Sequence, residues 1–574
     1  MDDVSSGPRL RRAQLVLALA PVAVWACMAW RARWVCDDAF IDFAVVRNVL
    51  AGAGPTLNVG QRVESFTNPL WVALLSLASA MVPGDPTQTL PWIAVLLGLA
   101  LSLAGLALPS VAACRRHDPT TARAFALPLG SLVVAALVPF HDFATSGLET
   151  GLTLAWLGLS WTLVDPARTT PPAAPRVVAV VLGLGPLVRP DLAVFALALG
   201  ALHVTALASL SRRRALVSAC VTAAPATLYQ VWRMAWYGCA LPTTALAKEP
   251  GLTRWDQGWC YLLDFATPYG LVVPVLALCV AVALAGRRAW RWYVLPAAAL
   301  THAVSIVRLG GDFMHARMLL PSLFALCLPV VVVAGEVRRT VAVLAPWSLV
   351  ALLVLRPPSG EMTPSGITNE RAFYVASAGV ANPVTLDDYR GTPWYQGGAA
   401  LRAMAASAQR RLTVASAITS EGRRLAGITV PSLRAGVPVR VVAANALALG
   451  ITASVAGPSV WLLDAHGLAD PFAARVELTT RGRPGHEKVL PPSWLVARYA
   501  DLDDPGVQPG LRDHPAVAAA RRALRCGPLV ELDDATRAPL TWRRALRNLR
   551  VAFSLTRLRI PADPRVAVVR FCGR

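Results

Sequence analysis

The chain has 574 residues, of which 55% are hydrophobic and only 16% are charged. Soluble globular domains are about 45–50% apolar and about 25% charged, so this composition excludes an ordinary soluble protein and indicates residence in a membrane. The net charge of +21 does not indicate a nucleic-acid partner, because several arginine clusters lie at the ends of apolar segments, where membrane topology requires them.

The first 356 residues consist mainly of apolar stretches close to the length of about 20 residues that a helix needs to span a bilayer. The first stretch follows three arginines and lacks a small-residue cleavage site, so we expect a retained signal anchor. A doubtful stretch at 69–83 is expected to be re-entrant or interfacial. The eleven expected spans are 13–32, 90–113, 122–140, 146–164, 176–188, 191–208, 215–232, 268–286, 290–307, 317–336 and 340–356.

Arginine-rich connections set the expected orientation of these spans, because such connections are retained in the cytoplasm. With the N-terminus also cytoplasmic, everything after residue 357 lies outside, together with five shorter segments. The arginine-rich connections are Arg115–Arg116, Arg212–Arg214, Arg287 with Arg288 and Arg291, and Arg338–Arg339. The outer segments are 34–68, 141–145, the residues around 189, 233–267 and 308–316. Most unusual polar residues of the membrane region gather in these segments, which indicates a site on the outer face.

Asp37 and Asp38 follow the first span directly. Joining a sugar to an acceptor hydroxyl requires a carboxylate that takes the hydroxyl proton, so a positioned aspartate is the expected general base. The alternative is that the two aspartates only cap the start of a helix. The residue pattern does not decide which of the two acts, and we favour Asp38 slightly.

Other polar side chains on this face are candidates for holding a donor phosphate or sugar. Ionisable groups at membrane depth are costly and therefore mark functional sites, although Glu149 could instead belong to a structural ion pair. Acids at one end and cations at the other suit an activated acceptor and a leaving phosphate. The candidates are Arg47, His141, Glu149, Arg189, Lys248, Asp312, His315 and Arg317.

Residues 357–574 have the composition of a soluble domain, so we divide the chain into a membrane domain at 1–356 and a C-terminal domain at 357–574. Apolar runs at 412–418, 437–442 and 460–463 predict strands between Gly/Pro-rich turns, and a helix is expected at 514–526. This extracytoplasmic domain is therefore expected to be mixed α/β or β-rich and is a candidate polysaccharide-binding module.

Four residues form the predicted set for acceptor binding or site closure. Aromatic side chains can stack on sugar rings, although packing in a core is the commoner fate of such residues. The four are Glu64 in the first outer loop and His486, Lys488 and Trp494 in the C-terminal domain; Trp394, Tyr395 and Trp461 are further stacking candidates.

Cysteines divide into two groups. Eight of the ten fall in or beside apolar segments, where they act as small packing residues. Cys526 and Cys572 both lie in the expected outer domain, and an oxidising compartment favours a disulfide between them. No zinc-type Cys/His spacing and no GxxxxGK[ST] phosphate loop is present, so nucleotide hydrolysis is not expected to drive this protein.

Long segments with distinctive polar residues run from the first outer loop into the C-terminal domain. They are DDAFIDFAVVRNVLAGAGP (37–55), GQRVES (60–65), DFATSGLETGL (142–152), LVRPDLA (187–193), YGCALPTTALAKE (237–249), RLGGDFMHARML (308–319), SGITNERAFY (365–374) and GHEK (485–488). With these segments in this order, the chain resembles the terminal β-(1→2) arabinofuranosyltransferases (AftB family) of mycolic-acid-bearing actinobacteria. That family belongs to the membrane-embedded glycosyltransferase C (GT-C) superfamily.

The resemblance implies a GT-C fold in the bacterial plasma membrane and a donor of decaprenyl-phosphoryl-arabinofuranose. It also implies an arabinan acceptor in arabinogalactan or lipoarabinomannan, and inversion at the anomeric carbon. The family's base position in the first outer loop matches Asp37 and Asp38. No cofactor is assigned, and the need for a divalent metal stays open, since some relatives use one. The segment ESFTN (64–68) and His141 depart from the family pattern and leave the substrate details open.

Three other functions compete with this one. A mannosyltransferase that uses the same kind of lipid-phosphate donor would have the same scaffold, because fold does not fix function. A transporter is disfavoured because the chain shows no internal repeat or paired broken helices. A non-catalytic surface or motility protein is the third alternative, and it requires that both aspartates be dispensable.

Overall fold

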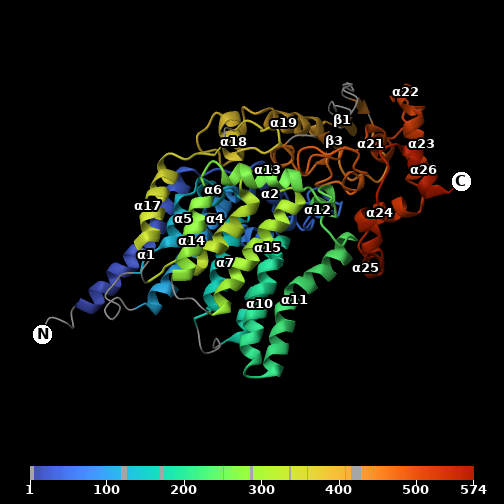
Figure 1. The fold of residues 1–574 in the computed structure, drawn as a ribbon. Coiled ribbons are helices and arrows are strands. Elements are labelled where there is room, and N and C mark those ends of the chain that lie inside the picture. Colours follow the sequence, from blue (N-terminus) through green and yellow to red (C-terminus); the bar gives the residue numbers. More distant parts are fainter. Residues whose placement is uncertain are drawn as a thin grey trace.

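Nearly all regular structure in the computed structural model is helical, with one small sheet near the C-terminus (Figure 1). The structure describes residues 6–117, 126–167, 174–249, 251–284, 289–334, 338–357, 360–407, 409–414, 428–430, 432–445, 448–507 and 509–573.

Five helices in the described part of the chain are long and apolar enough to cross a membrane, so this is a multi-pass membrane protein. The five are α1 (Ser6–Arg31), α4 (Pro86–Arg116), α10 (Ala193–Ala208) with the 3-10 turn η1 (Pro190–Leu192) before it, α11 (Arg212–Tyr237), and α15 (Val294–Leu309) with the 3-10 turn η2 (Trp290–Tyr293) before it. Shorter apolar helices pack beside them, namely α3 (Pro69–Met81), α7 (Thr150–Val164), α8 (Pro175–Gly183) with α9 (Gly185–Val188), α14 (Val272–Leu284), α16 (Leu320–Cys327) and α17 (Arg338–Leu353).

The expected span at 122–140 is not one continuous helix. Its described part forms α5 (Leu129–Ala136) and α6 (Val138–Phe143), with the extended residue Leu137 between them. Pro139 stands in the first turn of α6, where its missing N–H and its ring prevent the preceding helix from continuing through it. The doubtful stretch at 69–83 contains the 13-residue helix α3. Arg287 and Arg288 lie outside the described residues.

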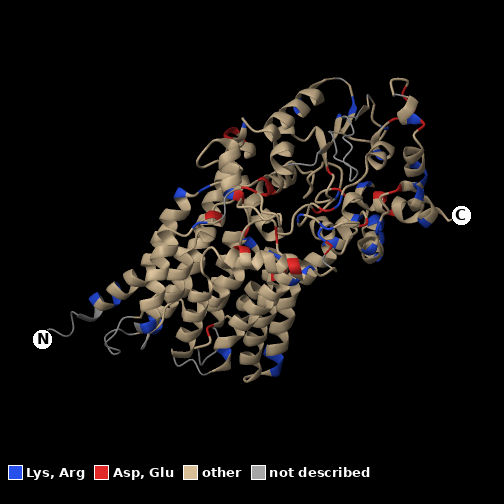
Figure 2. Cartoon of the chain, turned by 45° about the horizontal axis from the view of Figure 1, so that its top comes forward, with Lys and Arg blue, Asp and Glu red and all other residues tan. Residues whose placement is uncertain are grey.

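Charged residues are arranged along the membrane axis. Figure 2 shows acidic residues gathered where the membrane helices meet the part of the chain after α17, here called the polar domain. Basic residues lie at the opposite helix ends. The α10–α11 turn, which carries the arginines Arg212–Arg214 at the start of α11, lies at that opposite end (Figure 1).

Three helices connect the membrane segments on the side of the polar domain. They are α2 (Asp37–Leu50), α12 (Thr243–Ala247) and α13 (Trp255–Ala266). The short 3-10 turns are η1 (Pro190–Leu192), η2 (Trp290–Tyr293), η3 (Arg317–Leu319), η4 (Leu328–Val330), η5 (Leu386–Tyr389) and η6 (Ala473–Arg475).

The sheet has strand order β2-β1-β3-β4, with β1 parallel to β3, β3 parallel to β4, and β2 antiparallel at the edge. Its strands are β1 (Arg411–Val414), β2 (Ile428–Val430), β3 (Val441–Asn445) and β4 (Val460–Asp464). All five residues of β4 are buried, as expected for a strand covered on both faces. Three of these strands fall within or beside the predicted apolar runs. The helices of this region are α18 (Glu370–Ala378), α19 (Pro393–Ala406), α20 (Leu449–Ala456), α21 (Pro492–Tyr499), α22 (Pro509–Arg512), α23 (Pro515–Ala523), α24 (Gly527–Arg537), α25 (Trp542–Arg557) and α26 (Pro564–Cys572).

Apolar packing divides the chain differently from its composition. Ile367, Tyr374 and Val384 share one continuous buried cluster with the membrane helices, whereas the sheet and the helices after it form a separate core. In Figure 1, α18 and α19 accordingly lie over the ends of the membrane helices, and α21 to α26 lie to one side. Residues 360–406, which we call the roof segment, thus pack on the ends of the membrane helices.

The C-terminal core is closed by a disulfide between Cys526 and Cys572, which stand 46 residues apart. We expect the Cys526→Ser/Cys572→Ser variant to lose about 2–4 kcal/mol of unfolding free energy, because the crosslink restricts the unfolded chain. Chemical denaturation followed by tryptophan fluorescence measures this loss. Alkylation of both cysteines in the unreduced protein, detected as a mass shift, would contradict the pairing itself.

Candidate functional site

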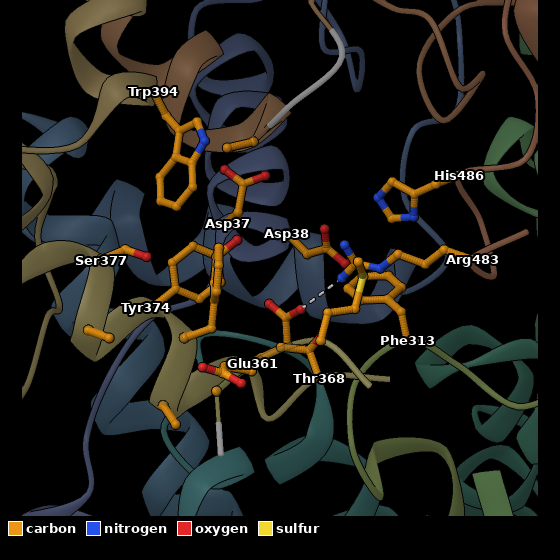
Figure 3. Close-up of a pocket in the computed structure, with 17 residues that line it drawn as sticks. Asp37, Asp38, Phe313, Glu361, Thr368, Tyr374, Ser377, Trp394, Arg483 and His486 are labelled. Atoms are coloured by element: carbon orange, nitrogen blue, oxygen red, sulfur yellow. Dashed lines mark hydrogen bonds and ion pairs between the residues drawn. The ribbon is translucent and has the colours of Figure 1, made fainter. Parts of the chain in front are cut away.

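A cavity of about 700 Å³ lies between the start of α2 and the roof segment. Figure 3 shows Asp37 and Asp38 at its centre, with Trp394, Tyr374 and Ser377 on one side and Phe313, Arg483 and His486 on the other. Thr368, Glu361 and Glu370 complete its polar lining. The cavity therefore combines residues from the first outer loop, the loop before α16, the roof segment and the C-terminal domain.

Asp37 lines the cavity and also links α2 to α20. Its carboxylate accepts hydrogen bonds from the backbone N–H groups of Ile451 at 2.7 Å and Gly450 at 3.2 Å, and the side chain is buried. These donors are the unpaired N–H groups at the start of α20, where the helix dipole also favours a negative charge. Burial nevertheless raises the pKa of Asp37 to about 7. Asp37 thus joins α2 to α20.

Gly450 permits this close approach. A Cβ atom at position 450 would come within 2.0 Å of the Asp37 carbonyl oxygen and 2.8 Å of the Ile41 backbone nitrogen. Only glycine fits there, because both neighbours are backbone atoms that cannot move aside independently. The start of α20 can therefore reach the Asp37 carboxylate directly.

Asp38 differs from its neighbour in having no hydrogen bond or ion pair to any residue that the structure describes. Burial raises the pKa of Asp38 above its usual range, and Arg317 opposes this rise as the strongest nearby charge. Asp312 and Glu149 raise this pKa further, whereas Lys248 lowers it. A carboxylate that lines a cavity, lacks a protein partner and has a raised pKa matches a general base.

A network of ion pairs surrounds Asp312 and acts on Asp38 through its charges. Lys248 Nζ lies 3.3 Å from Asp312 Oδ1, and Arg317 bridges Asp312 at 3.7 Å and Glu149 at 3.1 Å. Burial tends to raise the pKa of Asp312, but Lys248 and Arg317 lower it below its usual range, so Asp312 is ionised. The Lys248 side chain remains 42% exposed although its ammonium group pairs with Asp312.

Glu149 and Arg189 are joined within the membrane domain rather than facing the cavity. Arg189 donates two hydrogen bonds to Asp191, at 3.0 and 2.9 Å, and lies 3.7 Å from Glu149. His302 contacts Asp191 at 2.7 Å and Ser322 at 2.7 Å on its other ring nitrogen. These groups satisfy one another, as buried charges must, and Glu149 serves to orient Arg317.

Glu370 and Arg483 are cavity residues that the sequence reasoning missed as site residues. Arg483 Nη2 lies 3.4 Å from Glu370 Oε1, drawn as a dashed line in Figure 3. Burial and the charge of Asp38 raise the pKa of Glu370 to about 8, against the opposing effect of Arg483. At neutral pH Glu370 is therefore largely protonated and able to donate a hydrogen bond. The sequence signal that could have identified Glu370 is its position in the segment SGITNERAFY (365–374).

Aromatic rings line the cavity on both sides of the aspartates. Tyr374 and Trp394 have ring centroids 5.7 Å apart on one wall, and Phe313 meets His486 edge to face at 5.2 Å on the other. Arg483 also lies over the Phe313 ring at 4.7 Å. Flat apolar faces beside carboxylates are a common way to hold a sugar ring. Of the stacking candidates, Trp394 is the one that reaches the cavity.

His486 is the member of the predicted closure set that lines the cavity. Burial lowers the pKa of His486 to about 3, and the positive charges of Arg483 and Lys248 contribute to this shift. The imidazole is therefore neutral at physiological pH. The glycine beside it, Gly485, packs against the Lys248 side chain, with a hypothetical Cβ only 3.2 Å from Lys248 Cε.

None of the eight predicted phosphate or sugar ligands is among the residues that line the cavity, and three of them have contacts well away from Asp38. Arg47 stands roughly 15 Å further along α2 and donates to Thr87 and to the Ser454 carbonyl. His141 is buried and contacts the Ala135 carbonyl at 2.8 Å, within the broken segment α5–α6. His315 faces Asp264 at 2.6 Å instead. Helix periodicity and local folding direct these side chains elsewhere.

The other three members of the closure set have structural contacts. Glu64 receives paired hydrogen bonds from Arg233, at 2.6 and 3.1 Å. Lys488 is fully buried, and its ammonium group lies 2.6 Å from Glu249. Trp494 lies in the C-terminal core, where its indole N–H donates to the Ala562 carbonyl. All three are interior groups whose polar atoms already have partners, so they are not free for an acceptor.

No group of three or more His, Cys, Asp or Glu side chains suited to a metal ion occurs in the part of the chain that the structure describes. We therefore assign no metal ligands, and the metal requirement stays open.

Known proteins similar to this chain cover almost all of it. The terminal β-(1→2)-arabinofuranosyltransferase of Mycobacterium tuberculosis is 33% identical, with 98% of this chain and 98% of that protein aligned. The protein of the same name from Corynebacterium glutamicum is 31% identical, with 98% of this chain and 88% of that protein aligned. Residues 403–569 match the family described as the AftB family C-terminal domain. No solved structure was found to match.

Proposed function

The chain belongs to the terminal β-(1→2)-arabinofuranosyltransferase family, and we infer from this that it transfers arabinofuranosyl residues during the synthesis of cell-wall arabinan. One observation supports this cavity as the site of transfer: the Asp38 carboxylate lies between aromatic walls and has no partner among the described residues. We propose that the donor is decaprenyl-phosphoryl-arabinofuranose and that the acceptor is the end of an arabinan chain in arabinogalactan or lipoarabinomannan.

We propose a GT-C fold with about eleven membrane segments, a cytoplasmic N-terminus and a C-terminal domain outside the plasma membrane. The basic residues at the helix ends away from the polar domain support this orientation (Figure 2). The division at residue 356 remains our working boundary for the membrane domain.

The proposed chemistry is a single displacement with inversion. The acceptor hydroxyl oxygen attacks the anomeric carbon of the donor while Asp38 takes the hydroxyl proton. The new glycosidic bond forms as the bond between the anomeric carbon and the phosphate oxygen breaks. The electron pair of the broken bond leaves with the polyprenyl phosphate, whose tail stays between the membrane helices.

Cations beside Asp38 would hold the leaving phosphate. Lys248, whose side chain is partly exposed, is the first candidate, and Arg317, which shares Asp312 with it, and Arg483 of the cavity wall are the others. Fixed positive charges at this position stabilise the charge that develops on the phosphate as the bond breaks. Glu370, protonated at neutral pH, would donate a hydrogen bond to the sugar.

Lys248 should also set the pH dependence of transfer. Because Lys248 lowers the pKa of Asp38, Lys248→Met is expected to raise that pKa and move the acid limb of kcat/KM to higher pH. Arg317 still holds Asp312 ionised in this variant. Lys248→Arg keeps the positive charge and serves as the control, with an acid limb close to that of the wild type. An unchanged limb in Lys248→Met would contradict the electrostatic role.

The substrate proposal is tested by presenting purified protein with polyprenyl-phosphate arabinofuranose or polyprenyl-phosphate mannose and a short arabinan acceptor. We expect arabinose transfer and a product whose new linkage is β-(1→2) by NMR. Mannose transfer with no arabinose transfer would replace the proposed donor by that of a mannosyltransferase. Failure to transfer either sugar would count against the catalytic function.

A further inference from the structure

Helix α25 carries an exposed stripe that its own domain does not cover. The side chains of Trp542, Leu546 and Phe553 are 69%, 46% and 59% exposed. They lie on one face of the helix, because they follow one another at spacings of four and seven residues. The opposite face, which includes Asn548, is buried against the protein. An isolated exposed leucine is ordinary, but three large side chains in line on one short helix are not.

Arginines accompany this apolar stripe. Arg543, Arg550 and Arg557 form no ion pair with any residue described by the structure, and Arg543 lies over the Trp542 ring at 5.4 Å. Arg547 differs, because it pairs with Glu531 on the neighbouring helix α24. Three unpaired cations beside exposed Trp, Leu and Phe side chains are the composition of a helix that lies in a membrane interface.

The position of α25 relative to the membrane is fixed by contacts with the end of α11. Asn548 donates to the carbonyl oxygen of Ala235 at 3.0 Å, in the last turn of that membrane helix. Thr556 accepts a hydrogen bond from the Ala240 backbone N–H at 2.9 Å, just beyond the helix end. Figure 1 shows α25 beside this end of α11, on the side of the C-terminal domain that faces the membrane helices.

Aromatic residues mark the end of α11 as the boundary of the bilayer. Trp232 and Trp236 stack there with centroids 5.7 Å apart, and Trp232 is 37% exposed. Trp and Tyr are enriched where a membrane helix meets the headgroup layer. A helix attached within one turn of this boundary lies at the depth of the lipid headgroups.

We propose that α25 is an interfacial helix that binds the anionic phospholipid surface of the outer leaflet. Trp542, Leu546 and Phe553 insert into the boundary between headgroups and acyl chains, and the three unpaired arginines contact lipid phosphates. The helix thereby fastens the C-terminal domain to the membrane at a second place, away from α2 and α20. This domain also supplies Arg483 and His486 to the cavity, so the anchoring limits how far that wall of the site can move.

The test uses the full-length protein with a photoreactive benzoylphenylalanine at position 542 or 553. The matched control is the same group at position 569, because Val569 is 70% exposed on α26 in the same domain but away from α11. Each protein is placed in nanodiscs of phosphatidylcholine alone or of equal parts phosphatidylcholine and phosphatidylglycerol, irradiated and analysed by mass spectrometry for lipid adducts.

We expect lipid adducts at 542 and 553 but not at 569, with roughly fivefold or greater enrichment of phosphatidylglycerol over phosphatidylcholine in the mixed discs. Arg543→Gln/Arg550→Gln/Arg557→Gln should remove this enrichment while the adducts persist through the apolar residues. Crosslinks to a second copy of the chain in place of lipid, or equal adducts at 569, would overturn the proposal. The readout requires no sugar transfer, so it stands or falls independently of the proposed enzymatic function.

Discussion

Replacing Asp38 by asparagine is expected to lower the rate of arabinofuranosyl transfer by roughly 10²–10⁴-fold, the contribution usual for a positioned general base. The substitution keeps the shape of the side chain and removes only its ability to take the acceptor proton. Since no described residue forms a hydrogen bond or ion pair with Asp38, the fold should be unaffected. Single-turnover transfer to a short arabinan acceptor measures the effect, and unchanged thermal unfolding verifies that the protein is intact.

Asp37→Asn is the matched control, one residue away on the same helix. The asparagine oxygen can still accept a hydrogen bond from the start of α20, so we expect partial weakening of the domain contact and less than about a tenfold loss of rate. If Asp37→Asn were instead the inactive variant, the base would be Asp37. If both variants transferred arabinose at the wild-type rate, neither aspartate would be catalytic.

The second large effect is expected at Lys488, a buried residue that is not among those lining the cavity. Its ammonium group lies 2.6 Å from Glu249 and donates to the carbonyl oxygens of Leu246 at 3.0 Å and Ala474 at 2.7 Å. Lys488→Met should cost about 2–4 kcal/mol of unfolding free energy, because it leaves two buried carbonyl oxygens without their donor and removes one of the two cations beside Glu249, whose other partner Arg559 remains at 2.8 Å. Chemical denaturation followed by tryptophan fluorescence measures the loss.

Lys248→Met is the control for this stability prediction. Lys248 also pairs with a buried carboxylate, that of Asp312, and in both pairs a second cation remains, Arg317 for Asp312 and Arg559 for Glu249. The Lys248 side chain, however, is 42% exposed and donates to no backbone carbonyl among the described residues. We therefore expect its removal to cost no more than about 1 kcal/mol of stability, as is usual for a partly exposed pair. Equal losses of unfolding free energy for the two lysine variants would show that the buried contacts of Lys488 do not contribute more to stability than the exposed pair of Lys248.

Residue type alone does not show whether a lysine is buried or exposed. Lys248 and Lys488 both appear in the sequence as cations close to the expected outer face, and the sequence predicts both as site residues. Lys488 is 0% exposed in its side chain and bridges α12 to the C-terminal domain, while the Lys248 side chain beside Asp312 is 42% exposed. Burial depends on what packs above a residue, and for Lys488 that covering comes from segments more than 200 residues away.

The same holds for acids. Glu64 and Glu149 stand out in the sequence as carboxylates beside apolar segments, and each turns out to be neutralised by an arginine. Glu370 lies in a polar stretch that looks like an ordinary surface helix, yet it is buried in the cavity wall. Its protonation at neutral pH arises from burial and from the nearby Asp38 charge, neither of which is visible before the chain is folded.

The membrane character, the position of Asp37 and Asp38 directly after the first membrane helix and the family follow from the sequence alone. Apolar length and arginine placement are properties of single segments and need no partner, and so both can be recognised before folding. The tertiary structure decided which aspartate has a protein partner: the start of α20, more than 400 residues later, binds the Asp37 carboxylate, whereas no described residue binds that of Asp38, although both line the cavity. It also decided that Arg483 and Glu370 belong to the site, because long-range packing sets burial, and burial sets both the pKa and the availability of a charged group.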